Sequence, residues 1–284
     1  TPVFADVDPD TLLLDPKQVL LKITPRTKAI VAVDYAGQPC DYDALREIAD
    51  HRGIPIVSDA CHALGGTYND HQVGTLALMN VFSLHPLKHI TAGEGGVITT
   101  NDTELAKSMR KFRNHGINLE HRERENWLYE VTDLGYNYRI TDIQCALAIS
   151  QLRKLPGFVN KRREIAALYD SAFEDVEEFQ PLAIRPEVQH AYHLYVIKIN
   201  TDTLGTDRLS VFRELRSQNI GTNVHYVPVH MHPFYRNRFG TGPGLCPVAE
   251  SAYDRIISLP IFPRMTDEDV NYVIDEVLAL KNSS

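Results

Sequence analysis

Residues 83–96 read Ser-Leu-His-Pro-Leu-Lys-His-Ile-Thr-Ala-Gly-Glu-Gly-Gly, and the interpretation of the whole chain starts from them. Lys88 lies in the middle of this stretch, with an apolar run on one side and a glycine-rich turn on the other. Most lysines are solvated surface charges, so a lysine alone would indicate little. An amine held between an apolar run and a tight turn is instead placed to react.

A second stretch, upstream of the first, points to the same chemistry. Residues 54–62 read Ile-Pro-Ile-Val-Ser-Asp-Ala-Cys-His, a pattern typical of a buried strand that ends at the carboxylate of Asp59. Open α/β sheets bind their ligands at the carboxyl ends of the strands. An amine and a buried acid at neighbouring strand ends, beside a glycine-rich anion-binding turn, are the parts needed to hold pyridoxal phosphate.

These side chains have specific roles in that hypothesis, and ordinary alternatives. Lys88 would form the Schiff base with the cofactor aldehyde and, once released, would move protons, for which burial must lower its pKa. Asp59 would pair with the protonated pyridine nitrogen, worth about 5 kcal/mol at about 3 Å and an effective dielectric of about 20. An acid at a strand end is also a common turn former or helix cap. Ser83 would donate to the cofactor phosphate, or is an ordinary strand-end hydroxyl.

The histidines do not predict a metal site. His225, His230 and His232 are close in sequence and Cys61 adjoins His62, but none of them gives a recognised ligand spacing. We expect His62 to lie against the cofactor ring. His225 and Tyr226, at the end of an expected strand, are placed to touch a polar ligand.

Two further motifs have two interpretations each. Gly135-Tyr136-Asn137-Tyr138-Arg139 is either a tyrosine-rich packing loop or a loop whose Asn137 donates to a phosphate, across a subunit interface. The basic run Lys161-Arg162-Arg163 is either a solvated helix face or a site for a nucleotide diphosphate.

Composition limits the class of protein. The chain has 284 residues, of which 43% are hydrophobic and 23% charged, the values of an ordinary soluble globular protein. Its formal charge of -8 argues against a nucleic-acid partner, and no apolar stretch is long enough to cross a membrane. Its four cysteines are scattered and no signal peptide is evident, which favours reduced thiols and a cytoplasmic location.

The order of expected elements predicts an α/β fold with a large domain and a small one. In residues 1–155 we expect a mostly parallel sheet covered on both faces, with strands at 28–35, 54–58, 79–83 and 96–100 and helices at 42–51, 102–113 and 142–152. Pro156 and Gly157 interrupt the pattern, and we place the domain boundary there. In residues 156–284, an α+β unit, we expect helices at 159–173, 207–218, 247–256 and 266–280 and strands at 193–199 and 222–226.

With these residues in view, the chain resembles the DegT/StrS-type sugar aminotransferases, which depend on pyridoxal phosphate and have the aspartate aminotransferase fold (fold type I). The resemblance covers essentially the whole chain. It rests on the pattern S-x-H-x-x-K with its T-x-G-E-G-G-like turn, on the D-x-x-H-A-x-G segment from Asp59 to Gly65, and on G-Y-N-Y-R at 135–139. The segments Asn223-Val224-His225-Tyr226 and Ser258-Leu259-Pro260 look most like the enzymes of the pseudaminic acid branch, which aminate UDP-4-keto-6-deoxy sugars.

The resemblance implies a function as well as a fold. It implies amino transfer from L-glutamate to a UDP-sugar in polysaccharide biosynthesis, by a homodimer in which Asn137 reaches the phosphate of the partner's site, with Asn223, His225 and Tyr226 at the substrate. The family also carries an N-terminal segment, with a phosphate-binding turn and an aromatic residue on the cofactor ring, that this sequence lacks. A sugar dehydratase is one alternative, although family dehydratases replace the lysine with histidine. A truncated homologue that only dimerises or binds nucleotide sugar is the other.

Overall fold

The computed structural model describes residues 1–118 and 126–282. Its central sheet has the order β1-β2-β5-β6, formed by Ile30–Val33, Ile56–Asp59, Met79–Ser83 and Gly96–Thr99. β1, β2 and β5 are parallel, and β6 is antiparallel to β5. The mostly parallel sheet expected from the sequence is therefore confirmed, within one or two residues at most strand ends.

Two smaller sheets accompany the central one. The first has the order β10-β9-β7, formed by Ile256–Leu259, Tyr195–Ile199 and Phe179–Pro181, and all its pairs are antiparallel. The second has the order β4-β3-β8, formed by His71–Gln72, Thr67–Tyr68 and Val188–Gln189. The helices between the strands are α1 Pro16–Lys22, η1 Tyr35–Gly37, α2 Tyr42–Asp50, α3 Thr103–Arg113, α4 Asp142–Leu152, α5 Leu155–Phe173, α6 Thr201–Leu204, α7 Arg208–Ser217, η3 Val229–Met231, α8 Pro233–Phe239, α9 Pro247–Tyr253, α10 Asp267–Ala279 and η4 Leu280–Asn282.

The helix ends follow from local capping chemistry. Asp102 caps α3, and Thr141 forms a capping box with Gln144 at the start of α4, which explains why both helices begin within one residue of the predicted positions. Pro156 does not interrupt α5, because it lies in the first turn, where proline costs no hydrogen bond. α5 therefore begins at Leu155 rather than at Val159.

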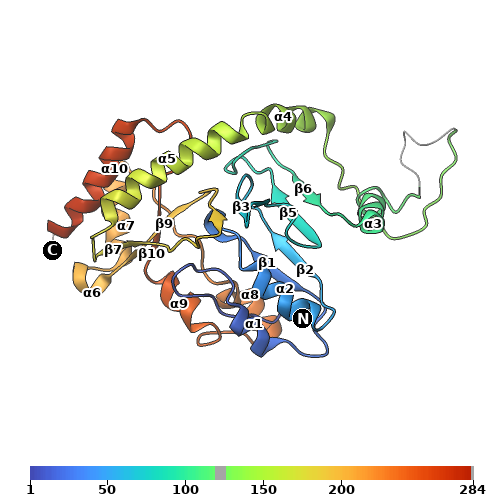
Figure 1. The fold of residues 1–284 in the computed structure, drawn as a ribbon, viewed down its shortest axis with the longest axis horizontal. Helices are drawn as coiled ribbons and strands as arrows, with labels where there is room; N and C mark the ends of the chain where they lie inside the picture. The colour runs from blue at the N-terminus through green and yellow to red at the C-terminus, as the bar shows by residue number, and fades with distance from the viewer. Residues whose placement is uncertain (119–125, 283–284) are drawn as a thin grey trace.

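α5 connects the two packed regions of the molecule. Its first turns, at Leu155 and Val159, pack against Leu84 and Ile90 of the Lys88 segment. Its later turns, from Ile165 to Phe173, belong to the core built on β7, β9 and β10. Figure 1 shows α4 and α5 following one another along one side of the molecule, from β6 to α10.

Three expectations about local structure are wrong. Residues 222–226 form no strand; Asn223 makes only an isolated bridge to Ser258. α9 ends at Tyr253 rather than at Ile256, and Ile256 begins β10, a strand that was not predicted from the sequence. The central sheet is covered on one face only among the described residues. Ile30 and Ala32 are buried, whereas the alternate side chains Val31 and Val33 are 60% and 45% exposed.

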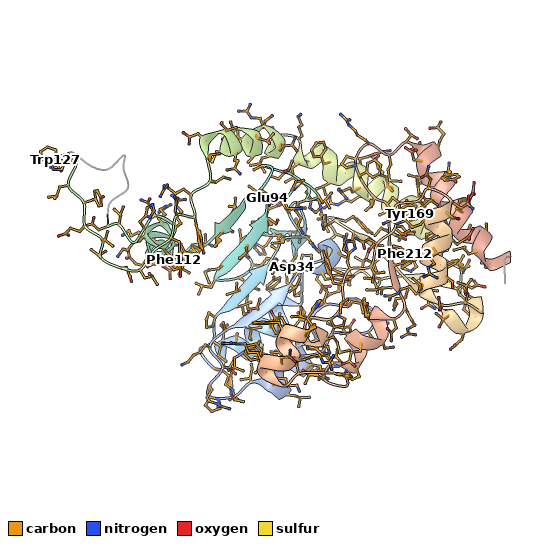
Figure 2. The ribbon with its side chains drawn as sticks, turned by 180° about the vertical axis from the view of Figure 1, so that it is seen from behind. Asp34, Glu94, Phe112, Trp127, Tyr169 and Phe212 are labelled. Atoms are coloured by element: carbon orange, nitrogen blue, oxygen red, sulfur yellow. The ribbon has the colours of Figure 1, made fainter. Side chains whose placement is uncertain are left out.

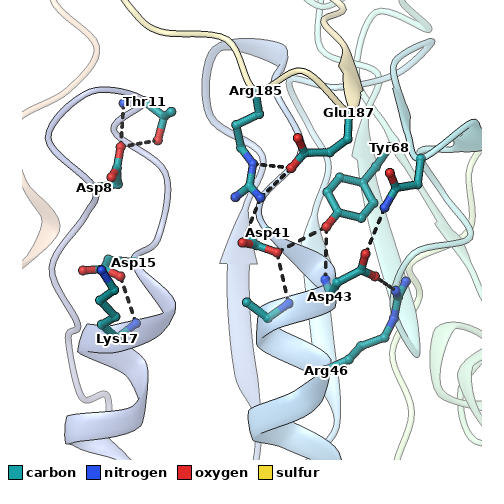
Figure 3. A network of polar contacts seen from close by, with 12 residues as sticks. Asp8, Thr11, Asp15, Lys17, Asp41, Asp43, Arg46, Tyr68, Arg185 and Glu187 are labelled. Atoms are coloured by element: carbon teal, nitrogen blue, oxygen red, sulfur yellow. Dashed lines mark hydrogen bonds and ion pairs between the residues drawn. The ribbon is translucent and has the colours of Figure 1, made fainter.

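A polar network fixes the segment that returns to the sheet after β7. Arg185 forms ion pairs with Asp41, at the cap of α2, and with Glu187. The Tyr68 hydroxyl donates to the same Asp41 carboxylate at 3.2 Å (Figure 3). The chain is thereby anchored just before β8, and residues 190–194 follow it onto the sheet. No described helix is both long and apolar enough to be a membrane span.

Candidate functional site

The site is built on the carboxyl ends of three adjacent strands. β1 is followed by Asp34, β2 ends at Asp59 and β5 ends at Ser83. Because these strands are parallel, their polar terminal side chains meet at one edge of the sheet. The strand register places Asp59 opposite Val33, on the open face, whereas Ser58 and Asp34 lie on the covered face.

Lys88 is presented by a closed loop that follows β5. The loop is closed by hydrogen bonds from the Leu84 N–H to Gly95 O, at 2.9 Å, and from the Ala92 N–H to Leu84 O, at 3.0 Å. Lys88 is half-buried. Burial lowers the pKa of its amine, while the charges of Cys61 and Asp59 act in the opposite direction. The amine and the carboxylate predicted from the sequence to converge therefore lie close enough to act on each other.

Asp59 has the ordinary role of a turn former and also faces the cluster. Its Oδ1 accepts from the Cys61 N–H at 3.2 Å. Burial raises the pKa of the Cys61 thiol to about 12, and the neighbouring Asp59 adds to this. The backbone N–H of Ser83 also faces the Cys61 sulfur, and the Ser83 hydroxyl accepts from the His85 N–H at 3.3 Å. Ser83 therefore lies next to Cys61, which in turn contacts Asp59.

A group of buried imidazoles packs behind Lys88. The ring of His193 lies 4.4 Å from that of His62 and 5.4 Å from that of His89, centre to centre. Burial lowers the pKa of His62 and of His89 to about 3, and also lowers that of His193, so the three rings are neutral. His62, His89 and His193 each have an Nδ1 that is buried without a hydrogen-bond partner among the described residues.

The predicted substrate residues reach this cluster from the C-terminal part of the chain. The Tyr226 hydroxyl lies 3.4 Å from Nε2 of His62. Burial raises the pKa of Tyr226, and the charge of Asp59 raises it further. His225 is held by Ser258, at 2.8 Å from Nδ1 to the hydroxyl, and by Asn223, at 3.3 Å from Nε2 to Nδ2. The structure therefore brings Tyr226 to His62 and within the influence of Asp59, although no strand carries it.

Two contributors to the site have no clear signal in the sequence. Tyr35, just after β1, donates its hydroxyl to the backbone oxygen of His225 and so ties the C-terminal segment to the sheet. His193 arrives on the 190–194 segment, which pairs with the turn after β1 through hydrogen bonds from Ala191 N–H to Gly37 O and from Leu194 N–H to Ala36 O. The polar side chain of Tyr35, at the end of the predicted strand 28–35, is the one signal that could have been used.

Gly37 allows this close approach of three segments. Its φ is +116°, and a Cβ there would lie 2.7 Å from the Tyr192 nitrogen and 2.9 Å from the His62 carbonyl oxygen. Such a contact is shorter than real Cβ atoms show, so any side chain would push the segments apart.

The arginines of the basic run on α5 are structural. Arg162 is buried and its Nη1 donates to the carbonyls of Tyr192, His193 and Ile261. Arg163 donates to His190 O and Gly65 O. The two guanidinium groups therefore clamp the segment that carries His193, and the expectation of a solvated helix face is wrong for Arg162.

Asn137 is placed apart from this cluster. It is exposed and forms a bridge with Asn114, at the C-terminal end of α3. Nearby, Tyr136 and Tyr138 stack at 4.9 Å and both contact Phe112. Figure 2 shows Trp127, on the same connection between α3 and α4, at one end of the molecule, whereas Asp34 and Glu94 lie near its middle. Among the described residues, the bridge of Asn137 is to Asn114 and not to the Lys88 loop.

The chain is similar to known aminotransferases in sequence and in fold. The model of the DegT/DnrJ/EryC1/StrS aminotransferase family matches residues 1–278. The spore coat polysaccharide biosynthesis protein SpsC of Bacillus subtilis is 38% identical over 282 residues, which are 98% of this chain and 72% of that protein. Helicobacter pylori PseC, an aminotransferase involved in the biosynthesis of pseudoaminic acid, superposes with a TM-score of 0.93 at 36% identity, over 100% of this chain and 74% of PseC.

A third similar protein has been solved with its cofactor. The sugar aminotransferase Spr1654 of Streptococcus pneumoniae, in its PLP form, superposes with a TM-score of 0.91 at 30% identity, over 100% of this chain and 76% of that one. These structures confirm the α/β fold expected from the sequence.

Proposed function

This chain belongs to the DegT/DnrJ/EryC1/StrS aminotransferase family, and we propose that it transfers an amino group from L-glutamate to a keto sugar nucleotide of the UDP-4-keto-6-deoxyhexose type. It is an enzyme of the sugar aminotransferase class. The observation that carries the proposal is that Lys88 follows β5 and Asp59 ends the adjacent parallel strand β2, near enough for the charge of Asp59 to raise the pKa of the Lys88 amine. The similarity to PseC and to SpsC supports a nucleotide sugar destined for a polysaccharide.

The residues present fit pyridoxal phosphate as the cofactor. A half-buried amine with a lowered pKa lies within the influence of a carboxylate, and His62, which contacts Tyr226, has an Nδ1 that is buried without a partner among the described residues. Lys88 would hold the aldehyde end, Asp59 the pyridine nitrogen and Ser83 the phosphate, with His62 against the ring. When bound, the cofactor supplies an electron sink for the reacting carbon.

The chain's own groups account for proton movement at that carbon. Burial lowers the pKa of Lys88, which makes the neutral amine more accessible and lets it take a proton and return it. Asp59 would hold the pyridine nitrogen, and its carboxylate would make a positive charge there favourable. The neutral imidazoles behind Lys88 add no positive charge that would oppose this arrangement.

The substrate side of the site is assigned to the segment 223–226. Tyr226 is 54% exposed and its hydroxyl stays protonated, because burial raises its pKa. It can therefore donate a hydrogen bond to a sugar oxygen next to His62. His225, fixed by Ser258 and Asn223, orients the segment from behind.

A second copy of the chain would complete the site. Asn137 lies on an exposed surface connection, away from its own Lys88. In a homodimer it would donate to the cofactor phosphate in the partner's site. The exposed apolar side chains around it, on α4 and on the connection from α3, suit a surface that another copy covers.

The test is an assay with a UDP-4-keto-6-deoxyhexose and L-glutamate, in which 2-oxoglutarate and the amino sugar are both measured. We expect both products from the unmodified chain and neither from Lys88→Ala, which should also lose the visible absorption of the bound cofactor. Lys107→Ala, on the exposed face of α3, is the control and should retain both. Turnover by Lys88→Ala at the normal rate would refute the proposal. Loss of a sugar hydroxyl without 2-oxoglutarate would instead indicate a dehydratase.

A further inference from the structure

The loop that carries Lys88 ends in a turn with little stiffness of its own. Gly93 and Gly95 have φ values of +81° and +148°, and the residues from Gly93 to Gly96 are exposed. Glycine gains conformational freedom in the unfolded or open state, so such a turn needs an external contact to stay in one conformation. The carbonyl of Gly95 also closes the loop through the Leu84 N–H. Movement of this turn would therefore be transmitted to Lys88.

One side chain from α4 contacts this turn. The Gln144 Nε2 donates to the backbone oxygen of Glu94 at 2.9 Å. The other end of the same amide, Oε1, accepts from the N–H of Thr141 at 3.1 Å and from its hydroxyl at 2.9 Å. The two ends of Gln144 thus connect the Lys88 loop to the first turn of α4.

The choice of amide at this position is informative. A capping box works with glutamate or glutamine at its third position, and glutamate also interacts favourably with the positive end of the helix dipole. Helix capping alone would therefore favour glutamate at position 144. Only the amide can donate to the Glu94 carbonyl, because a carboxylate is an acceptor at both oxygens.

Apolar packing supports the same junction. Ile140, just before α4, packs against the cluster of Leu84, Ile90 and Ala92 that underlies the Lys88 loop. A Cβ at Gly95 would lie 3.0 Å from Cδ1 of Ile140. The chain from Ile140 to Gln144, three residues beyond Asn137, is therefore attached to the Lys88 loop by a hydrogen bond and by a close apolar contact.

We propose that Gln144 is a positioning residue for Lys88, and that it couples the Lys88 loop to the connection that carries Asn137. The catalytic meaning of this coupling rests on the proposed function. If Asn137 enters the partner's site, one Gln144 supports two sites. It holds the Lys88 loop of its own subunit, and it holds the connection whose Asn137 contacts the phosphate bound by the partner.

The experiment compares Gln144→Glu with Gln144→Ala in the full chain, with and without added pyridoxal phosphate. Gln144→Glu keeps the capping box and loses the donor to Glu94, whereas Gln144→Ala loses both. Gln151→Glu introduces the same charge at the other end of α4 and is the matched control. Hydrogen–deuterium exchange of residues 84–96 and of 141–147, with the dissociation constant of the cofactor, gives the readout.

In Gln144→Glu we expect residues 84–96 to exchange about fivefold faster and the cofactor to bind about fivefold more weakly, the factor that corresponds to one typical hydrogen bond. Residues 141–147 should be unchanged in Gln144→Glu and faster in Gln144→Ala. Unchanged hydrogen–deuterium exchange of residues 84–96 in Gln144→Glu would overturn the proposal. So would faster exchange of residues 84–96 that is always accompanied by faster exchange of residues 141–147. The exchange without cofactor does not depend on the reaction, so failure of this inference and failure of the proposed function are separable.

Discussion

Two aspartates lie at the carboxyl ends of neighbouring strands of the central sheet, one on each face, and their environments are opposite. On the covered face Asp34 is fully buried and accepts from the Cys40 N–H, the Tyr42 hydroxyl and the Ser58 hydroxyl, at 3.0, 2.8 and 3.0 Å. On the open face Asp59 is half-exposed and faces Lys88. The N–H of Asp34 donates to the Asp59 carbonyl, so the two residues are neighbours in the sheet.

The difference shows how one edge of a sheet can place a structural acid on one face and a ligand-binding acid on the other. Alternation of side chains along a strand sends adjacent polar residues to opposite faces. The buried acid is satisfied by fixed donors and holds the strand ends together. The open acid keeps its carboxylate available to a ligand. We therefore expect substitutions on the covered face to affect folding and those on the open face to affect binding and turnover.

The largest effect is expected at Asp59. Asp59→Asn removes the charge that faces the cofactor nitrogen while keeping the shape of the side chain and the acceptor for the Cys61 N–H. Turnover should fall about 10³-fold, which corresponds to about 4 kcal/mol in the barrier. The free energy of unfolding should change by less than about 1 kcal/mol, because Asp59 is half-exposed. Steady-state kinetics with urea unfolding provides the measurement, and normal turnover would remove Asp59 from the site.

The next largest effect is expected on stability, at Gly37, where three segments of the chain meet. Gly37→Ala places a Cβ against the Tyr192 backbone and the His62 carbonyl at a positive φ, so we expect a loss of about 3 kcal/mol in the free energy of unfolding. Gly157→Ala is the control: it lies in α5 with no atom within 4 Å of the new Cβ and should stabilise the chain by roughly 0.5–1 kcal/mol. Equal stability of the two variants in urea would show that the three segments are not held as described.

The buried acid Asp34 should make the stability of the chain depend on pH. Burial raises the pKa of Asp34 from 3.8 to about 7. Between about pH 4 and pH 7 the folded chain therefore holds a proton that the unfolded chain has lost, and the contribution of Asp34 to stability falls as the pH rises, by about 1.4 kcal/mol for each unit.

Asp34→Asn removes this titration and can keep all three hydrogen bonds, because the Ser58 hydroxyl can accept from the new amide. The variant should gain stability relative to the unmodified chain from about pH 5 to pH 7, measured by urea unfolding. A constant difference between the two proteins over this range would contradict the assignment.

The smallest effect on the single chain is expected at the surface of α4. Ile143 is 84% exposed, at the second position of its helix, and Leu209 is 51% exposed at the second position of α7. Ile143→Glu and Leu209→Glu should each change the free energy of unfolding of the monomer by no more than about 0.5 kcal/mol. Only Ile143→Glu should weaken the proposed homodimer, measured by sedimentation velocity. Identical association of the two variants would place the dimer contact elsewhere.

Elements with a local cause could be predicted closely. α4 spans the predicted residues, and it begins where predicted because Thr141 and Gln144 form a capping box. β5 was bounded at Met79 and Ser83 by its apolar pattern. The late end predicted for α9, at residue 256, and the missed strand β10 have a physical origin: the two elements are separated by only two residues, and a short apolar run suits a helix and a strand equally well.

The sequence by itself determined that an amine and a carboxylate follow two parallel strands, because periodicity reports burial and parallel strands share one carboxyl edge. Only the tertiary structure decided that His193 packs behind Lys88, that Arg162 is buried against backbone carbonyls, and that Tyr226 reaches His62. Each of these contacts joins segments far apart in the chain. A side chain's own sequence neighbourhood records that it will be buried or exposed, but not which distant segment will meet it, since that depends on how the sheets and helices pack together.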